Sequence, residues 1–81
     1  MNDRQTLFEN RHRIHTTALG VTRIERNINR KVPDLIYYFE FVLSDKRCSV
    51  ERIGKNYYCF FDGIRWTIHA NSFTIITARL I

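Results

Sequence analysis

The stretch YYCFFDGIRWTIHA, residues 57–70, decides the fold. Asp62-Gly63 separates two runs of aromatic and β-branched residues, and Asp-Gly in that setting is the strongest short-range signal of a β-hairpin. A two-residue loop also fixes which residues pair across the two strands. The apolar pairs then share one sheet face and form the predicted core side: Phe61 with Ile64, Cys59 with Trp66, and Tyr57 with Ile68.

Two further strands extend this hairpin. The segment SVERIGK, residues 49–55, precedes it with Gly54 at the bend, and FTIITARLI, residues 73–81, follows a turn at Asn71-Ser72. These segments predict a four-stranded antiparallel meander. If the second loop also holds two residues, four further pairs follow: Ile68 with Ile75, Trp66 with Thr77, His69 with Thr74, and Arg65 with Ala78.

Helical periodicity dominates the first half of the chain. Thr16-Thr17 is a candidate N-cap for ALGVTRIERNIN, in which Val21, Ile24 and Ile28 recur on one helical face. Pro33-Asp34 begins a second helix, because proline suits an early helical position and aspartate favours the helix N-terminus. A short helix capped by Asn2 or Asp3 is a third candidate. Ser44-Asp45-Lys46 is expected to end the second helix.

Length and composition restrict the architecture to one small domain. The chain has 81 residues, of which 44% are hydrophobic and 14% aromatic, and this excludes both a multidomain enzyme and a disordered chain. We predict an α+β fold in which two or three N-terminal helices pack on one face of the four-stranded antiparallel meander. The single domain spans residues 1–81, with a helical part at 1–46 and a sheet part at 47–81.

The charge is basic and unevenly distributed. Thirteen Lys and Arg residues against eight Asp and Glu give a net charge of +5, and ten of the thirteen cations are arginine. Residues 1–31 carry +4, residues 32–45 carry −3, and residues 46–81 carry +4. Two basic segments around an acidic one predict an anionic partner that both basic parts of the fold contact. The alternative is a basic surface that only keeps the domain in solution.

The cysteine content and the hydropathy of the chain indicate in which cellular compartment it occurs. Cys48 and Cys59 are too few for a disulfide framework, and no apolar stretch resembles a signal peptide or a bilayer-spanning segment. We therefore expect a cytoplasmic protein with reduced thiols and no membrane partner. Cys59 lies within an aromatic run, where a thiol packs as a small hydrophobe.

No cofactor or metal site is predicted. His12 and His15 are three residues apart, but neither cysteine is near them in sequence to complete a ligand set. Gly20, Gly54 and Gly63 are isolated, so a glycine-rich phosphate loop is absent from the sequence. No nucleophile elbow is present either, which disfavours serine hydrolases and enzymes that use a nucleotide cofactor.

The second face of the predicted sheet carries the candidate chemistry. Aromatic rings on a sheet can stack on bases, while arginine neutralises phosphate. The candidate RNA-binding residues are Tyr58, Phe60, Arg65, Thr67, Thr74 and Arg79. The alternative is that the N-terminal segment covers this face and that His69 hydrogen-bonds Thr74.

A metal-independent ribonuclease needs a base, an acid and a cation at one phosphate. His69 is a candidate for one proton-transfer role, and His15, His12 or Glu51 for the other. Arg65 or Arg79 is the candidate phosphate clamp. The candidate catalytic residues are therefore His69, His15 and Arg65.

Three functions follow, in order of preference. The first is a small RNA-directed domain, with metal-independent ribonuclease activity as its sharper form. The second is a non-enzymatic module whose aromatic face binds a protein partner or a second copy of the chain. The third is a DNA-binding regulator that uses the arginine-rich helix, although no spacing in it specifies a groove-reading motif.

Several segments resemble a small bacterial family of domains of unknown function. The segments that carry the resemblance are IGKNYY at residues 53–58, ANSFTIITA at 70–78, and IHTTALGVTRIERNI at 14–28. The resemblance extends over residues 14–81 and implies no activity. A looser likeness, to the RelE and barnase-like ribonucleases, rests on helices before an antiparallel sheet and on the ending SFTIITAR. That likeness implies RNA cleavage by a toxin-like or phage-related nuclease.

Overall fold

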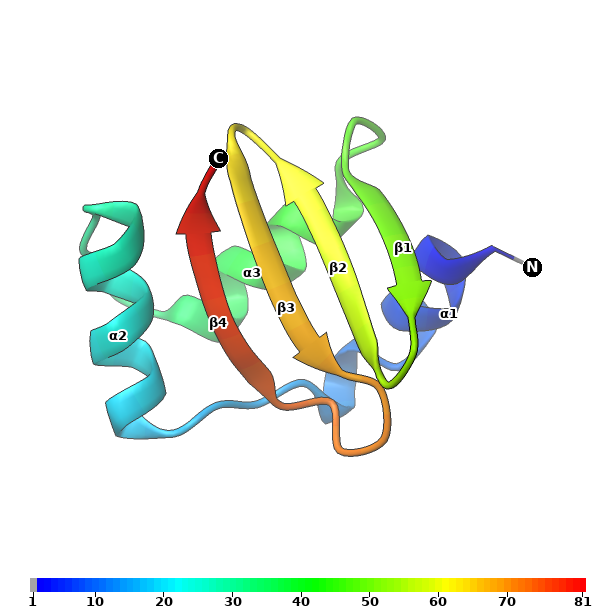
Figure 1. Ribbon diagram of the computed structural model, residues 1–81, viewed down its shortest axis with the longest axis horizontal. Helices are drawn as coiled ribbons and strands as arrows, with labels where there is room; N and C mark the ends of the chain where they lie inside the picture. Colours follow the sequence, from blue (N-terminus) through cyan, green and yellow to red (C-terminus); the bar gives the residue numbers. More distant parts are fainter. Residues whose placement is uncertain (1) are drawn as a thin grey trace.

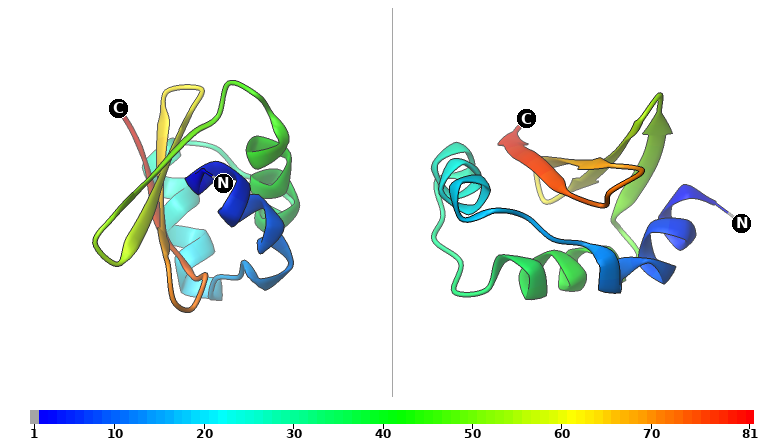
Figure 2. Two further views of the ribbon diagram at one scale, coloured as in Figure 1. Left: turned by 90° about the vertical axis from the view of Figure 1, so that its right-hand side faces the viewer. Right: turned by 90° about the horizontal axis from the view of Figure 1, so that it is seen from below.

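The computed structural model describes residues 2–81, in which helices precede a four-stranded sheet (Figure 1). The helical elements are α1 (Asp3–Glu9), the 3₁₀ helix η1 (Arg11–Arg13), α2 (Ala18–Ile28) and α3 (Leu35–Ser44). The strands are β1 (Ser49–Ile53), β2 (Asn56–Phe61), β3 (Ile64–His69) and β4 (Ile75–Leu80), paired antiparallel in the order β1-β2-β3-β4. The predicted α+β arrangement is confirmed. Helices α1 and α3 lie on one face of the sheet, and α2 lies beside β4 (Figures 1 and 2).

Each α-helix begins at a side-chain cap. Asn2, Thr17 and Asp34 accept hydrogen bonds from the backbone N–H groups of Gln5, Gly20 and Tyr37, respectively. Such caps satisfy N–H groups that have no partner inside the helix. The predicted N-cap at Thr16-Thr17 is confirmed at Thr17, and Asn2 is the correct one of the two candidates for α1. The predicted helix start at Pro33-Asp34 is confirmed, but Asp34 is the cap and Pro33 precedes the helix rather than occupying its first turn.

The core lies between α3 and the inner side of the sheet. Trp66 of β3 is fully buried, and its ring centroid is 4.8 Å from that of Phe39 and 5.9 Å from that of Tyr38, both on α3. Leu7 of α1 and Ile14 after η1 are also buried, so the apolar-poor N-terminus still joins the core. The helical layer therefore covers the inner face of the sheet.

The β2–β3 hairpin has the predicted pairing. Phe61 faces Ile64, Cys59 faces Trp66, and Tyr57 faces Ile68, with the other three pairs also as expected. Asp62 and Gly63 have φ angles of 54° and 70°. Two positive φ angles in succession match the twist of paired strands, which is why Asp-Gly is favoured there.

The predicted pairing of β3 with β4 is wrong at two positions. Ile68 faces Ile75 as expected, but Trp66 faces Ala78 rather than Thr77, and Arg65 faces Arg79 rather than Ala78. Residue 76 is an extra residue on β4, since Thr67 pairs with Thr77 and the next pair is Ile68 with Ile75. This β-bulge lets Ile75 and Ala78 both point into the core although they are three residues apart.

The β3–β4 loop is longer than the predicted two-residue turn. It spans residues 70–74, because Phe73 folds back into the protein with a φ of 58° and only 6% of its surface exposed. Its ring stacks with that of Tyr57 at 6.4 Å, and its N–H donates to the carbonyl of His69. The expected approach of His69 and Thr74 occurs through the backbone, where the His69 N–H donates to the Thr74 carbonyl at 2.9 Å.

The segment between η1 and α2 runs along the start of β4. Its backbone forms a parallel bridge with Thr74, in which the His15 N–H donates to the Phe73 carbonyl and the His15 carbonyl accepts from Ile75. The hydroxyl of Thr16 adds a bond to the Ile75 carbonyl at 3.0 Å. These contacts protect a sheet edge that would otherwise present unpaired backbone groups.

A carboxylate after α3 gives a testable pH dependence. Three nitrogens of Arg47, the backbone N–H, Nε and Nη2, donate hydrogen bonds to the carboxylate of Asp45. They hold the pKa of that carboxyl at about 2, against a usual 3.8. A folded-state pKa below the unfolded one stabilises the fold at higher pH, and this contribution is lost as pH falls through about 2.

We expect Arg47→Ala to raise the pKa of Asp45 toward 3.8 without reaching it, because the backbone N–H of residue 47 remains a donor. Carbon-detected NMR of the carboxyl group during an acid titration measures this value. Lys46→Ala, which removes a neighbouring cation that has no hydrogen bond to Asp45, should leave it unchanged. Identical titrations of the wild type and Arg47→Ala would contradict the assignment.

Within residues 2–81, no helix combines the length and apolar character needed to cross a bilayer.

Candidate nucleic-acid interface

The sheet face opposite the helical layer has no helix over it (Figure 2). We call it the outer face and define it by strand alternation and pairing. The alternative in which the N-terminal segment covers this face is wrong, because that segment runs along the helical side and the edge of β4. The outer face comprises Ser49, Glu51, Ile53, Asn56, Tyr58, Phe60, Arg65, Thr67, His69, Thr77 and Arg79.

Two arginines oppose each other on this face. Arg65 of β3 pairs directly with Arg79 of β4. Among the described residues, the two ion pairs are Arg30 with Asp62 and Arg47 with Asp45, so neither outer-face arginine has a carboxylate partner. Like charges directly across a strand pair destabilise a sheet. The pair is therefore an uncompensated concentration of positive charge.

Aromatic side chains adjoin this charge. The Arg65 guanidinium lies 5.9 Å from the centre of the Tyr58 ring, and its Nε is buried without a hydrogen-bond partner. The amide of Asn56 donates to the Tyr58 hydroxyl at 3.3 Å and so helps to hold the ring in place. Phe60, two residues further along β2, faces Arg65 and is half-buried. The outer face thus carries two aromatic rings, one of them held by a hydrogen bond, next to a planar guanidinium group.

Thr67 contributes little surface to this arrangement. It lies on the outer face of β3, as predicted, but only 7% of it is exposed. Its neighbours across the two strand pairs are Tyr58 and Thr77, and β3 is an inner strand of the sheet. Its hydroxyl therefore lies in the floor of the outer face.

His69 is tied to the loop that follows it. Its Nδ1 accepts the backbone N–H groups of Asn71 and Ser72 at 3.2 and 3.3 Å. A ring nitrogen that accepts two N–H groups carries no proton, so the proton of the neutral ring is on Nε2. The ring holds the β3–β4 loop, and Nε2 is the atom left for contact with a ligand.

His15 and Thr74 form a second arrangement on the same loop. Nδ1 of His15 bonds the Arg13 carbonyl at 2.9 Å, and Nε2 bonds the Thr74 hydroxyl at 3.0 Å. The Thr74 hydroxyl also bonds that of Ser72 at 2.8 Å. Thr74 thus belongs with His15, 59 positions away in sequence, rather than with the outer-face arginines.

The predicted catalytic residues do not meet at one point. His15 and His69 both contact the β3–β4 loop, but Arg65 is four residues before His69 on β3, which separates their Cα atoms by about 13 Å. His12 lies on η1 and is exposed. Glu51 is on β1, two strands from His69. The predicted residues therefore form two separate groups: His15 and His69 at the β3–β4 loop, and Arg65 with Arg79 further along the sheet.

Helix α2 borders the outer face, a contact that sequence reasoning missed. The amide of Asn27 donates to the Thr77 hydroxyl at 3.2 Å, which joins the helix to the outer side of β4. Arg23 is one turn earlier on the same helical stripe and is exposed. Both basic segments of the chain, through α2 and through β3–β4, thus reach this side of the molecule.

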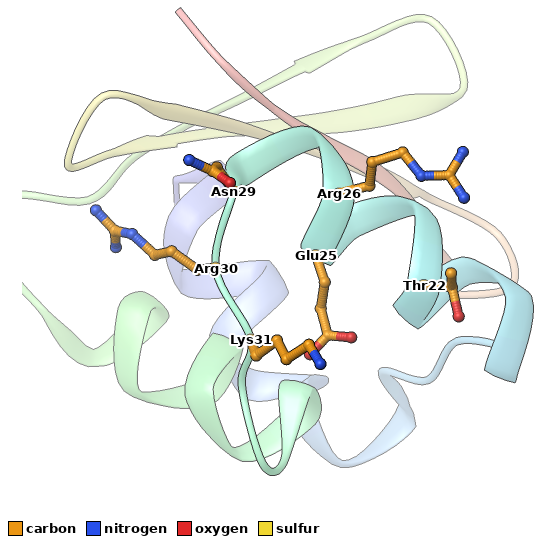
Figure 3. Close-up of a pocket in the computed structure, with 6 residues that line it drawn as sticks. All are labelled: Thr22, Glu25, Arg26, Asn29, Arg30 and Lys31. Carbon is orange, nitrogen blue, oxygen red and sulfur yellow. The ribbon is translucent and has the colours of Figure 1, made fainter.

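One hollow in the described part of the chain lies away from the outer face. It measures about 330 Å³ and adjoins the end of α2, where Arg26 and Arg30 point in opposite directions and Lys31 lies beside Glu25 (Figure 3). Glu25 also accepts the Val32 N–H. Three cations line this hollow, but its two arginines diverge, Lys31 lies beside a carboxylate, and the helix C-terminus is the negative end of its dipole. It therefore suits an anion less well than the arginine pair of the outer face.

The cysteines are buried against each other. Cys48 and Cys59 are free thiols, and the hydrogen bond with Cys48, together with burial, raises the pKa of Cys59. Cys59 is fully buried, so the prediction that it packs as a small hydrophobe is confirmed. Among residues 2–81, no three His, Cys, Asp or Glu side chains gather closely enough to hold a metal ion.

Comparison with known proteins identifies the family. A family model described as "Protein of unknown function (DUF3781)" matches residues 8–79. The chain belongs to this DUF3781 family. The predicted membership in a family of domains of unknown function is confirmed, whereas no comparison supports the looser likeness to the RelE and barnase-like ribonucleases. No curated protein and no solved structure matches the chain.

Proposed function

We propose that this domain binds single-stranded RNA on its outer face. The observation that carries the proposal is the direct pairing of Arg65 with Arg79 beside the rings of Tyr58 and Phe60. Two like charges without a carboxylate are unfavourable in the free protein, and a phosphate between them would remove that cost.

The chemistry of each group fits an unpaired strand. Arginine binds phosphate through two parallel hydrogen bonds, and among the described residues neither Arg65 nor Arg79 has a carboxylate partner that competes for its guanidinium group. The rings of Tyr58 and Phe60 offer π-faces on which bases can stack. Bases in a duplex are already stacked on one another, which favours single-stranded RNA.

Helix α2 supplies a second wall for the strand. Asn27 and Arg23 border the outer face beside β4. An RNA strand that extends from the arginine pair toward α2 therefore has a further cation, Arg23, for its next phosphates. This placement supports an anionic partner that contacts both basic segments.

Cleavage of the bound RNA is the sharper form of this proposal. It requires an acid and a base at one phosphate. His69 Nδ1 and both ring nitrogens of His15 already have protein partners, and Arg65 is about 13 Å from His69 along the strand. We therefore propose RNA binding as the function. Whether the bound RNA is also cleaved is tested on the samples of the binding titration.

Alanine variants of the arginine pair test the proposal. We expect Arg65→Ala and Arg79→Ala each to weaken binding of a fluorescent single-stranded RNA about tenfold, since each removes a charged hydrogen-bond donor worth roughly 1.5 kcal/mol. The dependence of log affinity on log salt should fall by about 0.7 per arginine. Fluorescence anisotropy at several salt concentrations in EDTA measures both quantities.

Arg11→Ala is the matched control, because it removes the same charge from η1 on the helical side. It should change the affinity far less than either outer-face variant. Equal losses in all three variants would mean that binding depends on the net charge of the protein and not on the outer face. Unchanged affinity in Arg65→Ala and Arg79→Ala would refute the proposal.

Denaturing gels of RNA from the same tubes show whether the RNA is cleaved. Loss of cleavage in His69→Ala would show that this protein, and not a contaminating nuclease, cleaves it.

A further inference from the structure

The helical layer carries an exposed aromatic pair on the side away from the sheet. Tyr37 and Phe41, one turn apart on α3, are 72% and 63% exposed. The residues of α3 that face the core are different ones: Leu35, Phe39, Val42 and Leu43. Large apolar side chains grouped in this way on a small basic domain indicate an interaction surface.

A groove between α1 and α3 adjoins this pair. Two hollows of about 210 and 240 Å³ share Phe8 and Ser44 in their linings, so they lie side by side between the two helices. A cavity of about 150 Å³ holds a benzene molecule, and each hollow is therefore large enough for an aromatic ring. The surface combines protruding rings with recesses that fit them. Tyr37, Glu40 and Phe41 line one of these hollows together with Arg11.

The charges on this surface complement each other. Arg11 lies with its guanidinium 4.2 Å from the centre of the Phe8 ring, while Glu40 is on α3 between the two exposed aromatics. Neither takes part in the ion pairs of the described residues. A two-fold interface places residue i against j and j against i. In a two-fold dimer built on this surface, a contact between Arg11 of one copy and Glu40 of the other is repeated by symmetry, so that two opposite-charge pairs form.

We infer that the α1–α3 groove is the contact of a two-fold dimer, in which each copy places Tyr37 and Phe41 in the groove of the other and pairs its Arg11 with the other's Glu40. The predicted homodimer through the aromatic sheet face is the less favourable arrangement, because it would bring Arg65 and Arg79 of both chains together. A dimer through the helical layer instead leaves both outer faces uncovered. This inference does not depend on RNA binding.

Charge reversal tests this pairing. Sedimentation equilibrium of the wild-type chain should give twice the 9.8 kDa of one chain as its concentration rises. Arg11→Glu and Glu40→Arg should each raise the dimer dissociation constant at least about tenfold, since like charges then meet at two symmetric places. An equimolar mixture of the two variants should associate again, because each contact in the mixed dimer joins opposite charges.

Phe41→Ser provides a second variant that removes one ring without changing charge. It should also weaken the dimer, and far-ultraviolet circular dichroism should show that it keeps its fold, since residue 41 is exposed. A wild-type mass of one chain at every accessible concentration would overturn the inference. So would a dimer that all three variants leave intact, or a mixture that associates no better than its components.

Discussion

Replacing both Tyr58 and Phe60 by alanine is expected to weaken binding of single-stranded RNA by at least about 30-fold. Stacking of one base on an aromatic side chain contributes about 1–3 kcal/mol, and this variant removes two rings from the outer face. The loss should persist at high salt, because stacking does not depend on the release of counterions. Anisotropy titrations at low and high salt measure it.

The chain offers a matched control for this variant. Tyr37→Ala with Phe41→Ala removes the same two residue types from the helical side, where both are exposed. Affinity for a short RNA should be unchanged in that control. The conservative exchange Tyr58→Phe with Phe60→Tyr keeps both rings and should retain most of the affinity. If the outer-face alanine variant binds as tightly as the wild type, base stacking on β2 is not part of the site.

Phe39→Ala is expected to have the largest effect on stability. Phe39 is fully buried, and its ring joins α3 to Trp66 of β3 at 4.8 Å. Truncation of a buried phenylalanine costs about 3–5 kcal/mol through lost burial and the cavity left behind. Domains of this size are stable by roughly 5–15 kcal/mol, so this one change removes a large share of the stability.

Urea denaturation, followed by Trp66 fluorescence at a protein concentration low enough for the chain to be monomeric, measures this cost. Tyr37→Ala, two residues earlier on the exposed side of α3, should alter the free energy of unfolding by no more than about 0.5 kcal/mol. Similar midpoints for Phe39→Ala and Tyr37→Ala would contradict the placement of the core between α3 and the sheet.

The elements that sequence reasoning predicted correctly have local signals. Asp62-Gly63 specifies a two-residue turn, and the turn alone fixes the β2–β3 pairing. Thr17 and Asp34 precede helical periodicities, and both are caps. The outer position of Tyr58 follows from strand alternation once that register is known.

The errors lie where several elements compete. Asn71-Ser72 resembles a two-residue turn, but burial of Phe73 against Tyr57 lengthens the loop, and the bulge at residue 76 then shifts the rest of β4. That shift is why the opposition of Arg65 and Arg79 could not be seen in the sequence.

Contacts between distant segments had no sequence signal at all. The bond from His15 to Thr74 joins positions 59 apart, and that from Asn27 to Thr77 joins positions 50 apart. Both contacts depend on how α2 and the segment before it pack against β4, and the hydrophobic periodicity of a single segment carries no information about that packing. The residue types of the outer face could therefore be predicted, but its borders could not.

Mapping of RNA contacts by NMR tests the central claim most directly. Amide spectra of the isotope-labelled chain would be recorded during titration with a short single-stranded RNA. Shifts confined to the outer face and its α2 border, including Tyr58, Arg65 and Arg79, are the result that the proposal predicts. No shifts at saturating RNA, or shifts that centre on Tyr37 and Phe41 of the helical layer, would contradict it.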